Sequence, residues 1–168
     1  MNFQCTLCGL CCRTLNAFVS PQDIDRWIED NRMDLISALV WQIIPGRNPP
    51  ALLMIPRKKH IKTHKMLAKY HRPEHDGNGA CIYLNKENKC TIHSERPEAC
   101  RTFPLGKLDF PTPGLEKGTI TEEDKNQAKE LATKRTESNQ TIYANREFYS
   151  QIILQARMHE KSTLGALI

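Results

Sequence analysis

The residues of this chain best suited to chemistry are seven cysteines among 168 residues. Four lie between positions 5 and 12 and three between positions 81 and 100: Cys5, Cys8, Cys11, Cys12, Cys81, Cys90 and Cys100. An odd number argues against a disulfide framework, since one thiol would be left over. Reduced, clustered cysteines are typical of metal sites, so all seven are candidate metal ligands.

The first group has the pattern C-x-x-C-x-x-C-C. Two residues between cysteines let a tight turn aim both sulfurs at one centre, and Gly9 supplies the backbone freedom for that turn. Three cysteines at such gaps also match the start of the bacterial ferredoxin run, which holds an iron–sulfur cluster. Because neighbouring side chains diverge, we expect only one of Cys11 and Cys12 to reach that centre. The expected set is Cys5, Cys8 and either Cys11 or Cys12, with Cys81, Cys90 or Cys100 completing the site.

Zinc is the alternative metal. A structural zinc site usually has two C-x-x-C knuckles, and the second knuckle is missing here. Seven thiolates and one histidine would nevertheless fill two tetrahedral zinc sites. Spacing therefore leaves iron–sulfur and zinc both open, along with the number of centres.

Three segments together carry a family resemblance: CTLCGLCCR at 5–13, CIYL at 81–84 and CTIHSERPEACRTFP at 90–104. They resemble the CxxCxxCC cysteine-cluster family, a zinc- or iron-chelating domain, and all seven cysteines fall on its pattern. The resemblance implies metal chelation through these positions, and members are often described as iron–sulfur proteins. A flagellin lysine methylase carries a related pattern, which adds assistance to a methyl transfer as an alternative. The family commonly has tyrosine at the position of His93, which favours packing of this side chain over ligation.

Arginines next to the cysteines are candidates for tuning the site. Arg13, Arg96 and Arg101 could donate hydrogen bonds to thiolates, or instead form salt bridges that fix the loops. No separate catalytic motif accompanies the cysteines, so the sequence leaves enzymatic activity open.

Composition and charge set the remaining bounds. The chain is 39% hydrophobic and carries a formal charge of +5, with a basic excess between Arg57 and Arg72. That stretch is either a solvated surface or a contact for nucleic acid or an acidic partner. The first residues lack the features of a signal peptide, and no apolar run approaches the roughly 20 residues of a membrane span. We therefore expect a cytoplasmic protein with no membrane contact.

Helix signals frame the cysteine groups. Ser20 and Pro21 predict a helix start, and apolar residues from Leu35 to Ile43 predict a second helix that Pro45 and Gly46 end. A capping box at Thr121 predicts a long polar helix within a C-terminal helical segment, 119–160.

Around the second cysteine group, the runs 81–84 and 90–93 predict a short β-hairpin, and Ser94 predicts a helix through Cys100. The fold class expected is α+β: a mostly helical small domain, 1–168, with irregular cysteine-rich loops and one hairpin around a metal site in 5–104.

The leading functional prediction is an iron–sulfur protein, with a [4Fe–4S] cluster, that serves electron transfer or redox support of a protein partner. The alternatives are a zinc-stabilised interaction module, an accessory to methyl transfer and a nucleic-acid binder.

Overall fold

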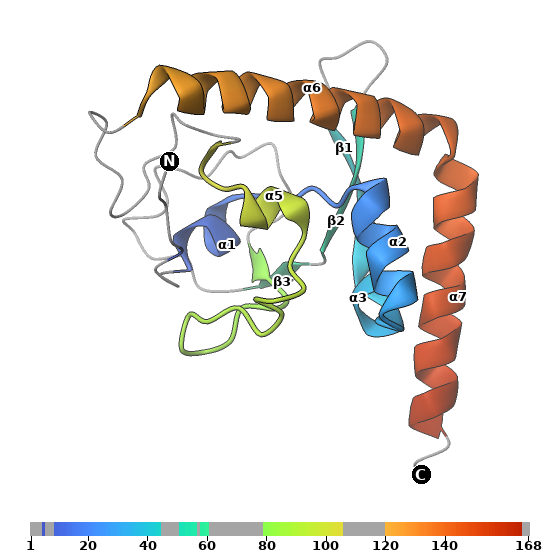
Figure 1. The fold of residues 1–168 in the computed structure, drawn as a ribbon. Coiled ribbons are helices and arrows are strands. Elements are labelled where there is room, and N and C mark those ends of the chain that lie inside the picture. Colours follow the sequence, from blue (N-terminus) through green and yellow to red (C-terminus); the bar gives the residue numbers. More distant parts are fainter. Residues whose placement is uncertain are drawn as a thin grey trace. The chain divides into compact units, whose positions relative to one another are not determined.

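The computed structural model describes residues 5, 9–44, 51–56, 58–60, 79–105 and 120–165 (Figure 1). The chain forms two compact units, Met1–Ala17 with Arg57–Ala132, and Phe18–Pro56 with Thr133–Ile168. Helices predominate in the described residues, together with two two-stranded antiparallel sheets. The predicted α+β, mostly helical class is therefore confirmed, while the single domain over 1–168 stays a prediction.

The unit that begins at Phe18 holds most of the apolar core. Its elements are α2 (Pro21–Glu29), α3 (Met33–Ser37), β1 (Leu39–Ile44), β2 (Ala51–Pro56) and α7 (Arg146–Gly165), with the end of α6 (Glu122–Ala144). Trp27, Leu35 and Met54 are fully buried here. α3 packs against α7 and α2, so the long C-terminal helix closes this core (Figure 1).

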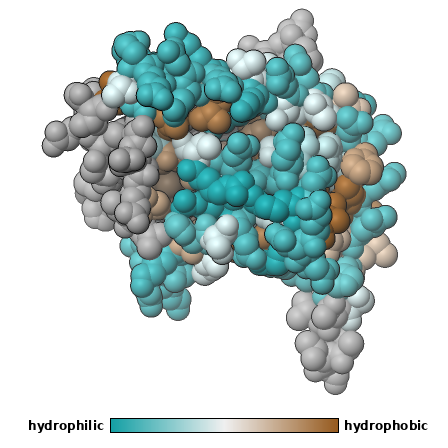
Figure 2. Space-filling model, viewed as in Figure 1, coloured by the Kyte–Doolittle hydropathy of each residue, from teal (hydrophilic) through white to brown (hydrophobic). Residues whose placement is uncertain are grey.

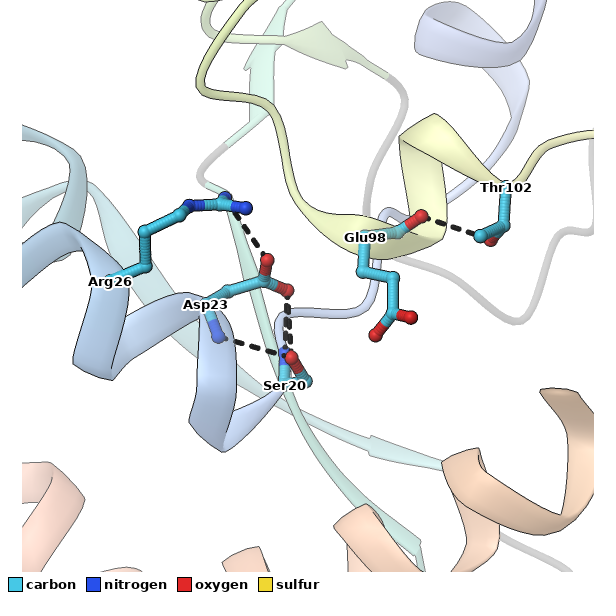
Figure 3. Close-up of polar contacts among 5 residues, drawn as sticks. All are labelled: Ser20, Asp23, Arg26, Glu98 and Thr102. Atoms are coloured by element: carbon cyan, nitrogen blue, oxygen red, sulfur yellow. Dashed lines mark hydrogen bonds and ion pairs between the residues drawn. The ribbon is translucent and has the colours of Figure 1, made fainter.

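A capping box starts α2, as the sequence predicts. The Ser20 hydroxyl accepts a hydrogen bond from the Asp23 backbone N–H (3.2 Å) and donates to the Asp23 carboxylate (2.9 Å). The same carboxylate accepts from the Ser20 backbone N–H (3.1 Å) and from Arg26 (3.1 Å), as Figure 3 shows. Ser20 and Asp23 are both buried, so these bonds satisfy polar groups that water does not reach.

The predicted second helix is wrong beyond Ser37. Residues Leu39–Ile44 form β1 and pair antiparallel with β2, in a register from Leu39 opposite Pro56 to Ile44 opposite Ala51. Val40, Trp41 and Ile43 are β-branched or aromatic, which suits a pleated surface once a partner strand is available. The spacing of the apolar residues also fits a helix, so it is the pairing with β2 that makes this segment a strand.

Arg157 of α7 fixes the point where α3 gives way to β1. Its Nε donates to the Ser37 carbonyl (3.1 Å) and its Nη2 donates to the Leu39 carbonyl (2.6 Å). The last carbonyls of a helix lack partners within the helix. Because α3 ends at Ser37, the carbonyls that follow need other donors, and the Arg157 guanidinium supplies them.

The other unit carries the cysteines. Its elements are α1 (Leu10–Thr14), β3 (Lys58–His60), β4 (Gly79–Cys81), α5 (Glu98–Arg101) and the start of α6. β3 and β4 are antiparallel, with Lys58 opposite Cys81, and α1 contacts β4. The rest of the basic stretch, 57 and 61–72, lies outside the described residues.

The predicted hairpin of 81–84 with 90–93 is present only in part. β4 ends at Cys81 and pairs with β3, but Leu84 forms an antiparallel bridge with Cys90, and the Thr91 backbone N–H donates to the Tyr83 carbonyl (2.8 Å). Between them the Asn85 side chain accepts backbone hydrogen bonds from Glu87 (3.0 Å) and Lys89 (2.8 Å). An asparagine that binds its own backbone favours a turn over a ladder.

The predicted helix from Ser94 to Cys100 is shorter in the structure. α5 begins at Glu98, with Pro97 as its N-cap residue. Proline disfavours helical backbone in the residue before it, so a helix through Arg96 is not available. α5 ends with the Thr102 hydroxyl donating to the Glu98 carbonyl at 2.9 Å (Figure 3).

The predicted C-terminal helical segment is two helices, α6 and α7, which meet at Asn145. The capping box at the start of α6 is present: Thr121 donates to the Asp124 carboxylate (2.7 Å) and accepts from the Asp124 backbone N–H (3.1 Å). The visible side of α6 is covered mainly by hydrophilic side chains (Figure 2). None of the described helices combines the length and apolar character that a membrane crossing requires.

Replacing Ser20 by alanine removes the cap of α2 and leaves the buried Asp23 carboxylate short of a donor. We expect the free energy of unfolding to fall by about 1–2 kcal/mol, measured from the urea midpoint. Gln22→Ala is the matched control, because Gln22 is exposed in the same turn and its loss should cost under about 0.5 kcal/mol. Equal midpoints for Ser20→Ala and the wild type would show that the cap adds nothing.

Candidate metal centre

All six cysteines that the structure describes are free thiols and partly buried: Cys5, Cys11, Cys12, Cys81, Cys90 and Cys100. They all belong to the same compact unit, which therefore joins the two sequence groups. Cys8 lies outside the described residues, so its predicted place in the site is not addressed by the structure.

The adjacent pair Cys11 and Cys12 opens α1. Their sulfurs lie 4.0 Å apart, so the expectation that these side chains diverge is wrong. Two thiolates on one tetrahedral zinc ion, each with a bond of about 2.3 Å, have their sulfurs about 3.8 Å apart. This pair is therefore close to the spacing that a single ion requires.

Four thiols from both sequence groups act on one another. Cys100 interacts electrostatically with Cys12, Cys81 and Cys90, and Cys90 also interacts with Cys12 and Cys81. Cys12 lies in α1, Cys81 ends β4, Cys90 forms the bridge with Leu84, and Cys100 lies in α5. We call Cys12, Cys81, Cys90 and Cys100 the four-thiol cluster. The sequence makes all three later cysteines candidate ligands and expects one of them to complete the first centre; in the structure Cys90 and Cys100 both interact with Cys12.

Two members of the four-thiol cluster, Cys90 and Cys100, have raised pKa values. Burial raises the pKa of Cys100 far above that of an exposed thiol, and the neighbouring thiols Cys12, Cys81 and Cys90 raise it further. Burial also raises the pKa of Cys90, with Cys12 and Cys81 adding to the effect. Each thiolate in such a group repels the next, so the thiols can ionise together only when a cation compensates their charge.

The three candidate arginines differ in what they contact. Arg96 interacts electrostatically with Cys90 and Cys100 and lowers the pKa of both thiols. Arg13 donates to the Asn88 side chain, and Arg101 is exposed beyond Cys100. Arg96 is therefore the candidate that fits tuning of the thiols, while Arg13 links the first cysteine segment to the turn at Asn88.

His93 is exposed, and its Nε2 meets the Arg96 guanidinium. The packing expected of this side chain is therefore not found, because His93 lies at the surface.

A close contact between Gly9 and Asn88 joins the two cysteine groups. Gly9 has left-handed backbone (φ 72°), and a Cβ placed there would lie 3.2 Å from the Asn88 Cβ and 3.3 Å from a Leu84 methyl. Asn88 is itself left-handed (φ 64°) and accepts the hydrogen bond from Arg13. The expected role of Gly9 in the turn is confirmed, and its missing side chain also lets the first cysteine segment approach the second.

Thiols are donors that suit zinc, iron–sulfur clusters and other soft metals. Within the described ranges, no three histidine, cysteine or acidic side chains converge on a single ion. The four-thiol cluster is an all-sulfur donor set, and it therefore fits a metal group that is bound by thiolates. Its four cysteines are among the seven candidate ligands that the sequence predicts.

A family model described as "CxxCxxCC: Putative zinc- or iron-chelating domain" matches residues 4–132. The chain belongs to this family. The match confirms the resemblance carried by residues 5–104 and extends into α6. Metal binding of the zinc- or iron-chelating kind is therefore the function class of this CxxCxxCC protein. Neither curated proteins nor solved structures give a match to the chain.

Replacing Gly9 by alanine tests the contact between the two cysteine segments. We expect a loss of about 1–2 kcal/mol from left-handed strain, with further cost from crowding against Asn88. The measurements are the melting temperature of the metal-loaded protein and the metal retained per chain. Gly9→Asn separates the two causes, because asparagine tolerates this backbone but still carries a Cβ. Unchanged melting temperature and metal content for Gly9→Ala would contradict the contact.

The pKa directions predict how metal binding depends on pH. Cys90 and Cys100 are protonated at neutral pH and must lose their protons to bind metal as thiolates. Affinity should therefore rise with pH, by about tenfold per pH unit for each proton released, or about a hundredfold for two. Competition with a chelator of known pH dependence measures the slope. A slope below one proton would contradict the raised pKa values, and Cys100→Ala should reduce the slope.

Proposed function

We propose that this chain is an iron–sulfur protein that holds a [4Fe–4S] cluster through Cys12, Cys81, Cys90 and Cys100. The observation that carries the proposal is the gathering of these four thiols from segments far apart in the sequence. Thiolates are the usual ligands of such clusters, and four are needed for one. The fold supplies that number from one compact unit.

The make-up of the donor set supports a cluster. Its four members are all cysteines, the usual ligands of [4Fe–4S] clusters, whereas zinc also takes histidine, and His93 lies exposed against Arg96.

The chemistry that such a cluster supplies when bound is the transfer of single electrons. Four protein thiolates would occupy one position on each iron, which favours electron transfer or redox support of a partner over direct substrate binding. Free cysteines in the described residues agree with a reducing compartment, and we place the protein's work in the cytoplasm. Cys5, Cys8 and Cys11 are then left as ligands for a second centre.

Zinc is the second candidate, and one distance favours it. The 4.0 Å between the sulfurs of Cys11 and Cys12 is close to the spacing on one zinc ion. In that case Cys11 and Cys12 share an ion, and the metal stabilises irregular loops as a structural site does.

Anaerobic purification followed by iron, zinc and acid-labile sulfide analysis tests the proposal. We expect iron and sulfide in equal amounts and a broad visible absorption, because thiolate-to-iron charge transfer absorbs visible light. A colourless protein with stoichiometric zinc and no sulfide would refute the cluster and support the second candidate.

Matched cysteine variants test the ligand set. Cys100→Ser removes a member of the four-thiol cluster, so we expect the absorption of this centre to be lost. Cys5→Ser removes a partly buried thiol outside that cluster, and the centre should remain. Retention of the full spectrum by Cys100→Ser, or its complete loss in Cys5→Ser, would contradict the assignment of these four ligands.

A further inference from the structure

We propose that Cys11 and Cys12 are interchangeable ligands for one position of the centre bound by the four-thiol cluster. This inference rests on the proposed iron–sulfur function and adds a fifth thiol to its ligand set. The centre then has four thiolates at any moment: three are fixed, and the fourth comes from either member of the adjacent pair. In a chain that holds one centre, this exchange gives Cys11 a role beside Cys12.

The distance between the two sulfurs carries the proposal. Cys11 Sγ and Cys12 Sγ lie 4.0 Å apart, and both side chains are partly buried. Successive residues of a helix point about 100° apart around its axis, so this closeness requires the two side chains to turn toward each other. A cysteine sulfur that moves from one staggered χ1 position to the next is displaced by roughly 3 Å. A side-chain rotation is therefore of the size needed to exchange the two sulfurs at one metal position.

The backbone that carries the pair is held on both sides. Before α1, Gly9 approaches Asn88 so closely that a Cβ built on it would lie 3.2 Å from the Asn88 Cβ. Directly after Cys12, the Arg13 side chain donates a hydrogen bond to the Asn88 side-chain oxygen. The Arg13 backbone N–H also donates to the Gly9 carbonyl (3.1 Å). Because both ends of the pair are tied to one residue, we expect exchange by rotation of the side chains and not by movement of α1.

The same asparagine connects the pair to the later cysteines. The Asn88 backbone N–H donates to the Asn85 carbonyl (3.2 Å), which closes the turn that leads to Cys90. Cys90 forms the bridge with Leu84, and a methyl of Leu84 would lie 3.3 Å from a Cβ on Gly9. The segment that carries the pair is thus packed against the turn and the bridge that position Cys90. One backbone arrangement therefore serves either sulfur of the pair.

The exchange replaces one iron–sulfur bond by another. The bond from iron to the Cys12 thiolate breaks as the bond from iron to the Cys11 sulfur forms, and the proton of the Cys11 thiol passes to the Cys12 sulfur. The number of thiolates, the charge of the centre and the oxidation states of its irons stay the same. The step therefore needs no oxidant or reductant.

The experiment compares the anaerobically purified wild type with Cys11→Ala, Cys12→Ala and the double variant. Iron, sulfide, visible absorption and melting temperature are measured on each. We expect either single variant to keep most of its iron and sulfide, and the double variant to lose both. Alanine is a stronger helix former than cysteine, so these changes do not weaken α1. Cys90→Ala is the matched control: no cysteine lies beside it in the sequence, and its loss alone should remove the centre.

Thiol labelling tests the exchange without any substitution. N-ethylmaleimide adds to a thiol that is not bound to metal, and tandem mass spectrometry locates the adduct. The loaded wild type should take one label on the pair, at Cys11 in some molecules and at Cys12 in others, while it keeps its iron and sulfide. Label at only one of the two positions, or at neither, would overturn the exchange.

The outcomes separate this inference from the function on which it rests. Loss of the centre from a folded Cys12→Ala variant would show that Cys12 is a fixed ligand. Loss from both single variants would show that the two thiols bind metal together, as they would on one zinc ion. Either result would overturn the exchange, whereas absence of iron and sulfide from the wild type would refute the proposed function itself.

Discussion

The electrostatics of the four partly buried thiols constrain the rest of this unit. Neutral thiols can pack together at little cost, whereas neighbouring thiolates repel one another and lose their hydration. Burial and proximity both raise the pKa values of Cys90 and Cys100. These two thiols are therefore protonated in the metal-free protein, and a bound cation must replace their protons. Metal binding, proton release and the local fold are linked through this one group of sulfurs.

The scaffold has to bring short, irregular segments together to build that group. The pairing of β3 with β4 places Cys81 at a strand end, and the contact of Gly9 with Asn88 brings the first cysteine segment to the second. Pro97 is the N-cap residue of α5, the helix that carries Cys100. Among the described residues, most of the buried apolar side chains, including Trp27, belong to the other compact unit. A metal that crosslinks the cysteine segments would add stability to the unit that carries them.

Local signals in the sequence predicted local structure well. The caps at Ser20 and Thr121 and the turn at Gly9 follow from side-chain and backbone preferences within a few residues. The errors fall where a distant partner competes with local preference. Leu39–Ile44 has apolar spacing that fits a helix, but β2 provides a partner and makes it a strand. Cys81 pairs with Lys58 of β3, so the hairpin expected of the two later runs is reduced to a bridge between Leu84 and Cys90 with its turn.

The sequence by itself determined the chemistry: seven cysteines in two groups, the membership of a metal-chelating family and the candidate arginines. The spacing of the cysteines is enough to indicate metal binding, because ligand type and short turns depend only on neighbouring residues. Only the tertiary structure decided that Cys12 interacts with Cys90 and Cys100, that the sulfurs of Cys11 and Cys12 lie 4.0 Å apart, and that Gly9 approaches Asn88. Those facts depend on contacts between segments distant in the chain, and the distance between two segments in space is not encoded in the spacing within either one.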